Sequence, residues 1–373
     1  MNGRETFLNV MEYKPVKKVP NYELGVWGQV IDRWEHEGLK PYTCHWAWFP
    51  GEEFFGMDCR EFININFDML PPFEYEVLEE TDRYILARNQ KGIVSKGLKE
   101  GMVRGTRLCM DHYISFPVST MEDFRTLQKR YEAALPARYE PQWRHKAKAW
   151  KMRDHVLVLG GNCQIAGFYW RAREWMGTEN LSYAWYDQPE LCEAMMAHFA
   201  DFTIEVARPV LETTDVEYVT LNEDLSGNSG PLVGPETFKK FIFPHLKRLI
   251  EFFKSHGVRY VWLDTDGNCE PLIPLFMDAG VDLLWPLERP GNMDPVRIRK
   301  KFGKSLRLHG GVDKRELAKD KTAIKNHLLH LVPLIEEGGY IPAVDHTVPP
   351  EVSFDNFKYY MEMKHLLLEG RLK

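Results

Sequence analysis

Short apolar segments alternate with amphipathic ones through the second half of the chain. From about residue 154, apolar runs end in glycines, acids or histidines, and helical patterns lie between the runs. Strands are predicted at 155–160, 216–221, 259–263, 283–285, 306–308 and 340–344. Helices are predicted at 189–210, 235–255, 295–302 and 321–337. Short buried strands that alternate with helices indicate a parallel α/β fold.

The first 150 residues follow a different pattern. Residues 1–40 are predicted to be helical, with breaks at Pro15 and Pro20, and the aromatic stretch 42–49 is predicted to be the first strand. Residues 73–118 contain an apolar alternation and a polar turn, which indicate an antiparallel hairpin inserted early in the fold, where it could help to cover a pocket. Residues 121–149 form a charged helical segment that follows a capping-box-like start.

The length of the chain agrees with one closed barrel. Its 373 residues exceed the roughly 250 of a minimal (β/α)₈ barrel. No GxGxxG motif follows the first predicted strand, which favours a barrel over a doubly wound sheet. The expected architecture is therefore a single (β/α)₈ TIM barrel over 1–373, with an N-terminal helical extension and a β-hairpin insertion at 73–118.

Composition and charge narrow the classes of function. A formal net charge of −6 without a basic patch argues against a nucleic-acid partner. No apolar run approaches the roughly 20 residues of a membrane span, and the charged first residues do not form a signal peptide, so a cytoplasmic protein without membrane attachment is expected. Its six cysteines form no CxxC pair, which favours free thiols over a disulfide framework.

Acids and histidines follow each of five successive predicted strands. In a barrel these positions meet at one rim, where barrel enzymes place their catalytic groups. The candidates are Glu223, Asp224, Asp264, Asp266, Glu288, His309 and His346. Such residues either bind a divalent metal or act as general acids and bases on a polar substrate.

Each candidate also has a purely structural explanation. Asp264 and Asp266 can cap the following helix or form an Asx turn. Glu223 and Asp224 can be solvated loop charges, and Glu288 can pair with the neighbouring arginine. His309 can be a buried structural histidine, and His346 can stabilise the turn that follows it. The shared rim favours the functional explanation, because all the sites fall on one predicted face.

Aromatic residues form the second set of candidates. The chain has 11 Trp, 16 Tyr and 21 Phe. Such residues usually build a core, but they also line pockets for flat or aromatic ligands. Those expected near the pocket are Trp46, Trp48, Phe49, Phe168, Tyr169 and Trp170, with Trp46, Trp48, Phe168 and Tyr169 as the preferred substrate contacts.

Several motifs in the second half resemble the uroporphyrinogen decarboxylase-like superfamily. They are Leu-Asp-Thr-Asp-Gly-Asn at 263–268, Leu-Trp-Pro-Leu-Glu at 284–288 with Met-Asp-Pro at 293–295, His-Gly-Gly-Val-Asp-Lys-Arg at 309–315, and the run at 338–350. The resemblance covers about 150–370 clearly and implies a (β/α)₈ barrel. The haem-pathway decarboxylases of this superfamily carry an arginine-rich N-terminal motif, RQAGRYLP, which is absent here. That absence disfavours a multi-carboxylate macrocycle as the substrate, because arginine forks would hold it.

The resemblance also implies zinc, as in the methyltransferases that serve corrinoid proteins. In their thiol-activating branch a His-x-Cys pair and a later cysteine bind the metal, and the matching positions here are Asp264, Asp266 and His346. The missing sulfur ligands disfavour thiol methylation. A second branch, which demethylates aryl methyl ethers, has two glutamates and a histidine. Glu288 and His309 match its spacing, but the first glutamate falls at Ile273.

The resemblance therefore implies the methyltransferase component of a corrinoid-dependent O-demethylase system. It would move a methyl group from a small methyl ether, aryl by preference, to a cob(I)alamin-carrying corrinoid protein. The expected metal is zinc, with Asp264, Asp266, Glu288 and His309 as candidate ligands. Glu223, Asp224 and His346 would act on the substrate or transfer protons. The alternatives are a decarboxylase or lyase for a small carboxylated substrate, and a non-catalytic corrinoid- or tetrapyrrole-binding protein. The assembly is left open, a homodimer included.

Overall fold

A curled parallel sheet forms the centre of the molecule. The computed structural model describes residues 1–42, 53–104, 106–107, 109–160 and 165–373. Neighbouring strands follow the order β1-β8-β10-β13-β14-β15-β16, and β9 pairs with β10. These strands are β1 (Arg60–Ile63), β8 (Val156–Leu159), β9 (Ile165–Ala166), β10 (Tyr218–Asn222), β13 (Tyr260–Asp264), β14 (Leu283–Trp285), β15 (Arg307–His309) and β16 (Tyr340–Ile341). All their pairings are parallel, so the carboxyl ends of the strands face one side of the molecule.

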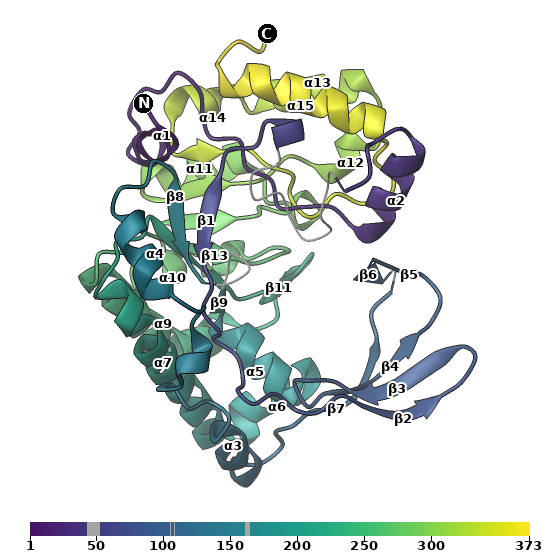
Figure 1. The fold of residues 1–373 in the computed structure, drawn as a ribbon, viewed down its shortest axis with the longest axis vertical. Coiled ribbons are helices and arrows are strands. Elements are labelled where there is room, and N and C mark those ends of the chain that lie inside the picture. The colour runs from purple at the N-terminus through teal and green to yellow at the C-terminus, as the bar shows by residue number, and fades with distance from the viewer. Residues whose placement is uncertain (43–52, 105, 108, 161–164) are drawn as a thin grey trace.

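Helices cover the outside of this sheet (Figure 1). Those in the N-terminal half are α1 (Gly3–Met11), α2 (Gly28–His36), α3 (Met121–Gln128), α4 (Trp143–Trp150), α5 (Phe168–Met176), α6 (Thr178–Asp187) and α7 (Pro189–Leu211). Those in the C-terminal half are α8 (Pro235–Thr237), α9 (Phe243–Ser255), α10 (Ile273–Ala279), α11 (Pro295–Phe302), α12 (Lys314–Leu317), α13 (Lys321–His330), α14 (Val332–Glu337) and α15 (Phe354–Leu368). Their apolar faces and the outward side chains of the strands form the larger core.

A second core fills the inside of the curled sheet. Tyr218 and Trp262 stack there with ring centroids 3.9 Å apart, and Phe7 of α1 lies 5.7 Å from the Tyr218 ring. These residues belong to one buried cluster with inward side chains of β8, β14 and β16. Helix α1 therefore closes the amino-terminal end of the sheet, and ligands have to enter at the carboxyl ends.

Residues 21–26 lie between the two edge strands of the sheet. In the described part of the chain, β16 and β1 form no ladder with each other. Instead Val26 bridges Val348, the Glu23 carboxylate accepts a hydrogen bond from the Val344 amide at 2.8 Å, and an Arg60 guanidinium nitrogen lies 3.5 Å from the Glu23 carbonyl oxygen. The sheet is thus a half-barrel whose open side is spanned by an irregular segment.

An antiparallel sheet projects from this body, to the lower right in Figure 1. It has the order β2-β3-β4-β7, with β2 (Glu76–Glu80), β3 (Tyr84–Arg88), β4 (Val94–Leu98) and β7 (His112–Ser115). A small hairpin of β5 (Met102–Val103) and β6 (Thr106–Arg107) follows β4, and a separate pair, β11 (Ser226–Gly227) and β12 (Gly230–Pro231), lies at the end of β10. We call residues 76–115 the arm.

The arm touches the body at two places. At one end Lys91, in the turn between β3 and β4, pairs with Glu174 of α5. At the other end Arg104 pairs with Asp32 and Glu35 of α2, at 2.6 and 2.7 Å. The arm therefore reaches from α5 to α2 beside the carboxyl ends of the parallel strands.

The sequence patterns located the six later strands to within a few residues. The strand predicted at 42–49 lies mostly outside the described residues, and β1 at Arg60–Ile63 was not predicted. The helical segment predicted at 121–149 is two helices, because a 3₁₀ turn at Pro136–Arg138 interrupts it. The helix predicted at 321–337 is likewise divided before Val332, where Pro333 follows at the second helical position. In the described residues, no helix has the length and apolarity that crossing a membrane requires.

Candidate functional site

Five of the predicted rim residues lie together at the carboxyl ends of the parallel strands. The charge of Asp266 raises the pKa of both Asp224 and Asp264, and the charges of Asp266 and Glu288 raise that of His346. We call Asp224, Asp264, Asp266, Glu288 and His346 the rim cluster. The parallel register explains the cluster, because it aligns the strand ends at one edge.

Asp266 and His346 form a pair within the rim cluster. The Asp266 carboxylate lies 3.3 Å from Nε2 of His346. Burial lowers the pKa of His346, but the hydrogen bond and charge of Asp266 raise it more, so the net pKa lies above its ordinary value. On the other side of the ring, Nδ1 lies 2.8 Å from the Thr347 hydroxyl, which accepts a hydrogen bond from the Trp27 indole at 2.7 Å. The ring is therefore fixed at both nitrogens and can carry a proton.

Asp264 is the member of the rim cluster whose side chain has no polar partner among the described residues. It ends β13, and in the described residues its carboxyl forms no hydrogen bond or ion pair. Burial raises its pKa well above the ordinary value, and the carboxylates of Asp266 and Asp224 raise it further. Such surroundings favour the protonated form of a carboxyl, which can act as an acid.

Asp224 connects the rim cluster to helix α5. Its carboxylate accepts a hydrogen bond from Arg173 at 2.6 Å, and the guanidinium of Arg173 lies over the Trp170 ring, 4.6 Å from its centroid. Burial raises the pKa of Asp224, while Arg173 opposes that rise. Asp224 also has a φ of 38°, which is uncommon for a residue with a side chain.

Glu288 is held by two partners. One oxygen lies 2.7 Å from the Lys314 ammonium, and the other accepts a hydrogen bond from the Gly267 amide at 3.0 Å. Its neighbour Arg289 pairs with Asp294 instead. Asp345 supports the same loops by accepting hydrogen bonds from the amides of Arg289 and Lys314, and burial raises its pKa to about 6.

Glu223 lies behind the rim cluster and caps a helix. Its carboxylate is completely buried and accepts hydrogen bonds from the amides of Phe168 and Tyr169, at 3.0 and 2.8 Å, in the first turn of α5. Burial raises its pKa to about 7, although the two amides lower it. A carboxylate at this place accepts hydrogen bonds from first-turn amides that have no partner within the helix. It also interacts favourably with the helix dipole.

His309 points into the barrel instead of toward the rim cluster. It is 2% exposed, its Nδ1 lies 2.9 Å from the Ile341 carbonyl oxygen, and its ring lies between Trp262 and Trp285, with centroids 5.4 and 5.6 Å away. Burial lowers its pKa to about 3. The ring is therefore neutral at physiological pH and packed in the inner core.

The four predicted metal ligands do not converge. In the described residues, no group of three or more His, Cys, Asp or Glu side chains is arranged to hold a metal ion. Asp264 and Asp266 lie in the rim cluster with Glu288, which Lys314 neutralises, and His309 lies inside the barrel. The donor set in this conformation thus does not fit zinc, and we derive no step through a metal.

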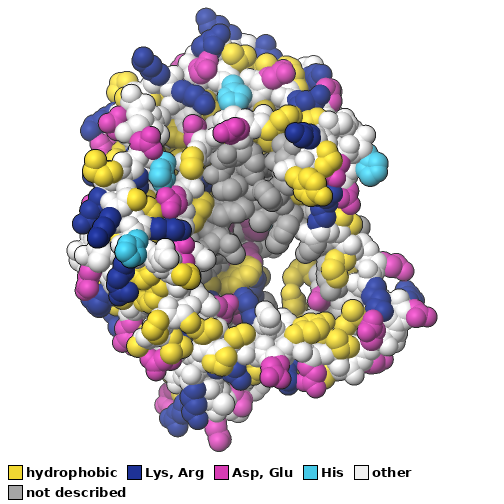
Figure 2. Space-filling view, in the orientation of Figure 1, with side chains coloured by type: hydrophobic (Ala, Val, Ile, Leu, Met, Phe, Trp, Pro, Cys, Tyr) yellow, Lys and Arg dark blue, Asp and Glu magenta, His cyan; other side chains and the backbone are white. Residues whose placement is uncertain are grey.

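A cavity of about 640 Å³ lies at the carboxyl ends of β1, β9 and β10. Figure 2 shows the face of the molecule hollowed between the body and the arm. The cavity is lined by ends of β1, β9 and β10, by α5 and by the turn of the arm that carries Lys91. Asn222, which lines it, pairs in register with Asp264, and Trp170, which also lines it, contacts Arg173 of the Asp224 pair. The cavity is therefore connected to the rim cluster through Asn222 and Trp170, although no member of the cluster lines it.

The predicted aromatic contacts are only partly near this cavity. Trp46, Trp48 and Phe49 lie outside the described residues. Phe168 and Tyr169 are 0% and 1% exposed, pack into the core and do not line the cavity, whereas Trp170 does. Burial raises the pKa of Tyr169 to about 12, so its phenol stays neutral.

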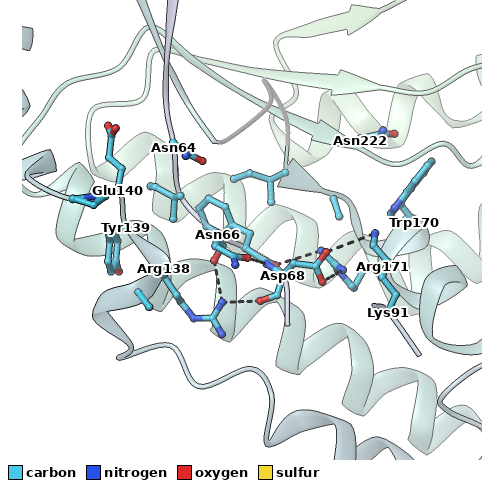
Figure 3. Close-up of a pocket in the computed structure, with 16 residues that line it drawn as sticks. Asn64, Asn66, Asp68, Lys91, Arg138, Tyr139, Glu140, Trp170, Arg171 and Asn222 are labelled. Carbon is cyan, nitrogen blue, oxygen red and sulfur yellow. Dashed lines mark hydrogen bonds and ion pairs between the residues drawn. The ribbon is translucent and has the colours of Figure 1, made fainter. Parts of the chain in front are cut away.

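Several residues at the site were not predicted. Asn64 and Asn222 project into the cavity from the ends of β1 and β10 (Figure 3), and Lys314 and Arg173 neutralise members of the rim cluster. The position of Asn222 directly after a predicted strand was a usable signal. Arg173 lies within a helix and gives no such signal.

The chain belongs to the uroporphyrinogen decarboxylase family, whose model, described as Uroporphyrinogen decarboxylase (URO-D), matches residues 117–366. This confirms the resemblance inferred from the motifs. No curated protein matches the chain. Among solved structures, a methyltransferase from Methanosarcina mazei is similar over 98% of both chains, with 14% identity and a TM-score of 0.61. That likeness supports the α/β fold with its barrel-like sheet.

Two further solved structures have lower similarity. A B12-independent methionine synthase from a Shewanella species is 12% identical, over 63% of this chain and 67% of that one, with a TM-score of 0.38. A putative vitamin B12-independent methionine synthase from Listeria monocytogenes is 11% identical, over 60% and 68%, with a TM-score of 0.34.

Proposed function

We propose that this protein is the methyltransferase component of a corrinoid-dependent O-demethylase system. It takes a methyl group from a small aryl methyl ether and passes it to a corrinoid protein. Asp264 carries the proposal: burial raises the pKa of its carboxyl well above the ordinary value, and it pairs in register with Asn222, which lines a cavity large enough for a small aromatic molecule. Family membership and the fold shared with a methyltransferase support it.

The reaction breaks the bond between the methyl carbon and the ether oxygen. The electron pair of that bond stays on the oxygen, so a phenolate leaves unless a proton reaches it. Asp264 donates this proton, and the Asp266–His346 pair, which is 3.3 Å apart, returns a proton to the site. The corrinoid, bound to its partner protein as cob(I)alamin, supplies the nucleophile that receives the methyl group, and no residue of this chain is assigned to hold it.

Zinc remains a prediction from the family resemblance. Metal analysis of the purified protein tests this directly. Stoichiometric zinc that is lost in Glu288→Ala or His309→Ala would support the predicted ligands, and zinc that both variants retain would contradict them.

A decarboxylase or lyase is the second candidate, because the family model is that of a decarboxylase. The products separate the two functions. A panel of aryl methyl ethers and of methoxylated carboxylates is incubated with protein and cob(I)alamin, and phenols and carbon dioxide are measured. We expect phenol without carbon dioxide. Carbon dioxide without any phenol would overturn the proposal in favour of a lyase.

A further inference from the structure

We infer that the cavity takes an uncharged ligand, which Asn64 and Asn222 orient through hydrogen bonds. This inference names the substrate class of the site and rests on the proposed function. It depends on the state of every charged group that lines the cavity, and Figure 3 shows these groups.

The two cations beside Asp68 are already neutralised. Arg171 donates to the carboxylates of Asp68 and Glu174, at 2.9 and 2.8 Å, and also to the Phe67 carbonyl. Lys91 pairs with Glu174 and lies 3.6 Å from the second oxygen of Asp68. Two cations and two carboxylates thus form one closed group, and no positive charge remains for a ligand.

The other charged side chains of the lining, Arg138 and Glu140, also have partners within the protein. Arg138 is 1% exposed and donates to the carbonyls of Glu132, Asn66 and Asp68, at 2.7, 3.0 and 2.7 Å. Glu140 pairs with Lys146 at 2.6 Å. Arg138 has no carboxylate partner in the described residues, but it is almost completely buried and its guanidinium donates to backbone carbonyls. The other ionised side chains of the lining that the structure describes are paired with opposite charges.

Two amide side chains of the lining have both their oxygen and their nitrogen free of hydrogen bonds to the described residues, whereas the oxygen of the third, Asn66, is occupied. The side chains of Asn64 and Asn222 form no hydrogen bond with the described residues, and both lie at carboxyl ends of parallel strands. A primary amide offers two donors and one acceptor, which match hydroxyl and ether oxygens. A carboxylate in the same place would lose its hydration without gaining a hydrogen bond from a cation, because the donors of Arg138 are bound to backbone carbonyls and Arg171 and Lys91 are paired with carboxylates. That loss is costly.

The inferred ligand is therefore a neutral ring that carries hydroxyl and methoxy groups, and Trp170 offers it an aromatic surface. A matched pair of probes tests this: 4-hydroxy-3-methoxybenzyl alcohol and 4-hydroxy-3-methoxybenzoate differ only in the charged group. Calorimetric titration without corrinoid gives each Kd. We expect the alcohol to bind at least tenfold more tightly, and equal or tighter binding of the benzoate would overturn the inference.

The same titration, repeated with variants of the two asparagines, tests whether their amides bind the alcohol. Asn64→Ala and Asn222→Ala are expected to weaken binding of the alcohol at least fivefold, whereas Asn228→Ala, in an exposed turn outside the cavity, leaves it unchanged. Unchanged binding in both cavity variants would contradict the assigned role of the amides.

A variant that binds the benzoate more tightly than the wild type would test the account of the charges most directly. Glu174→Gln releases one cation of the closed group, so the benzoate is expected to bind at least fivefold more tightly than to the wild type. Asp68→Asn does the same with a more exposed carboxylate, if Glu174→Gln does not fold. No gain in any folded variant would contradict the account of the charges.

The inference and the proposed function can fail separately. Preference for the alcohol without any methyl transfer would leave the inference standing and remove the function. Methyl transfer from the benzoate at the rate of the alcohol, with equal Kd values, would keep the function and remove the inference.

Discussion

Single residues at the strand ends differ in chemistry because their neighbours differ. Asp345 and Glu223 are buried carboxyls, but each is bound by two backbone amides, so their oxygens are occupied by the fold. Asp264 is only partly buried and its carboxyl accepts no hydrogen bond in the described residues, so it is the carboxyl that is available to a substrate. Hydrogen bonds, rather than position along the chain, thus separate the structural acids from the chemical one.

The acid role of Asp264 predicts a pH dependence. Its pKa lies well above the ordinary value because of burial and of the carboxylates of Asp266 and Asp224. The rate of methyl transfer should therefore stay constant through the range near pH 4 where ordinary carboxyls ionise, and fall at higher pH as Asp264 loses its proton. A profile of kcat/KM against pH measures this, and a rate that rises as Asp264 ionises would contradict it.

Glu223 predicts a pH dependence of stability. Its pKa is raised from 4.5 to about 7 in the folded protein. The folded state then binds more protons than the unfolded state between these values, so the stability that Glu223 contributes is complete below about pH 4.5 and is lost as pH rises to 7. The free energy of unfolding of the wild type, relative to Glu223→Gln, should fall by about 3 kcal/mol over this range.

Denaturant unfolding at several pH values measures that difference. Glu236→Gln, on the exposed first turn of α8, is the matched control and should show no such trend. A difference that increases with pH would show that Glu223 is held ionised in the folded protein.

The sequence predicted which residues lie at the strand ends. It could not predict whether their side chains point to the rim cluster or into the inside of the curled sheet. Asp264 and His309 both end a predicted strand, yet Asp264 reaches the rim cluster and His309 packs between two tryptophans. Strand stagger in the curled sheet sets the depth of each end, and it depends on pairing between distant segments. The hydrophobic pattern within one segment therefore does not predict how deep the end of its strand lies in the sheet.

At the scale of elements, polar contacts between described residues join the arm to α2. Arg104 forms two exposed ion pairs there, and the Gln29 side chain donates to the Gly101 carbonyl at 3.1 Å. Exposed ion pairs contribute about 0.5 kcal/mol each, so this end of the arm should open locally.

Arg104→Gln should increase amide hydrogen exchange at 98–104 several-fold and leave the melting temperature within about 1 °C, because surface pairs contribute little to global stability. Lys99→Gln, which removes the pair with Glu80 within the arm, is the matched control. Unchanged exchange in Arg104→Gln would show that other contacts hold the arm.

Regular elements were predictable where one segment contained the whole signal. The six strands predicted after residue 154 are apolar runs, and each was found close to its predicted place, whereas the two-residue strands β9, β11 and β12 were not predicted. Strand β1, Arg-Glu-Phe-Ile, is short and half polar, and it becomes a strand only because β8 pairs with it. Such tertiary context overrides local preference.

At the scale of the whole molecule, a buried ion pair joins the two ends of the chain. Glu23, in the segment that spans the open side of the half-barrel, accepts from Lys364 of α15 and from the Tyr360 hydroxyl, each at 2.5 Å. Both Glu23 and Lys364 are almost completely buried. The pair fixes the C-terminal helix against the segment at 21–26.

Lys364→Met should lower the free energy of unfolding by about 3–5 kcal/mol, because it leaves the Glu23 carboxylate buried without its cation. Lys358→Met, on an exposed position of the same helix, should change it by less than about 0.5 kcal/mol. Denaturant unfolding gives both values. A similar, small effect of the two variants would contradict the structural role of the pair.

The central claim is that Asp264 protonates the leaving oxygen of a neutral aryl methyl ether while its methyl group moves to a corrinoid. The most direct measurement is the initial rate of methyl transfer from 4-hydroxy-3-methoxybenzyl alcohol to cob(I)alamin, followed in the visible spectrum, for the wild type, Asp264→Asn and the exposed control Asp278→Asn. We predict transfer by the wild type and Asp278→Asn, and a loss of about 100-fold or more in Asp264→Asn. No transfer by the wild type, or equal rates for all three proteins, would contradict the account.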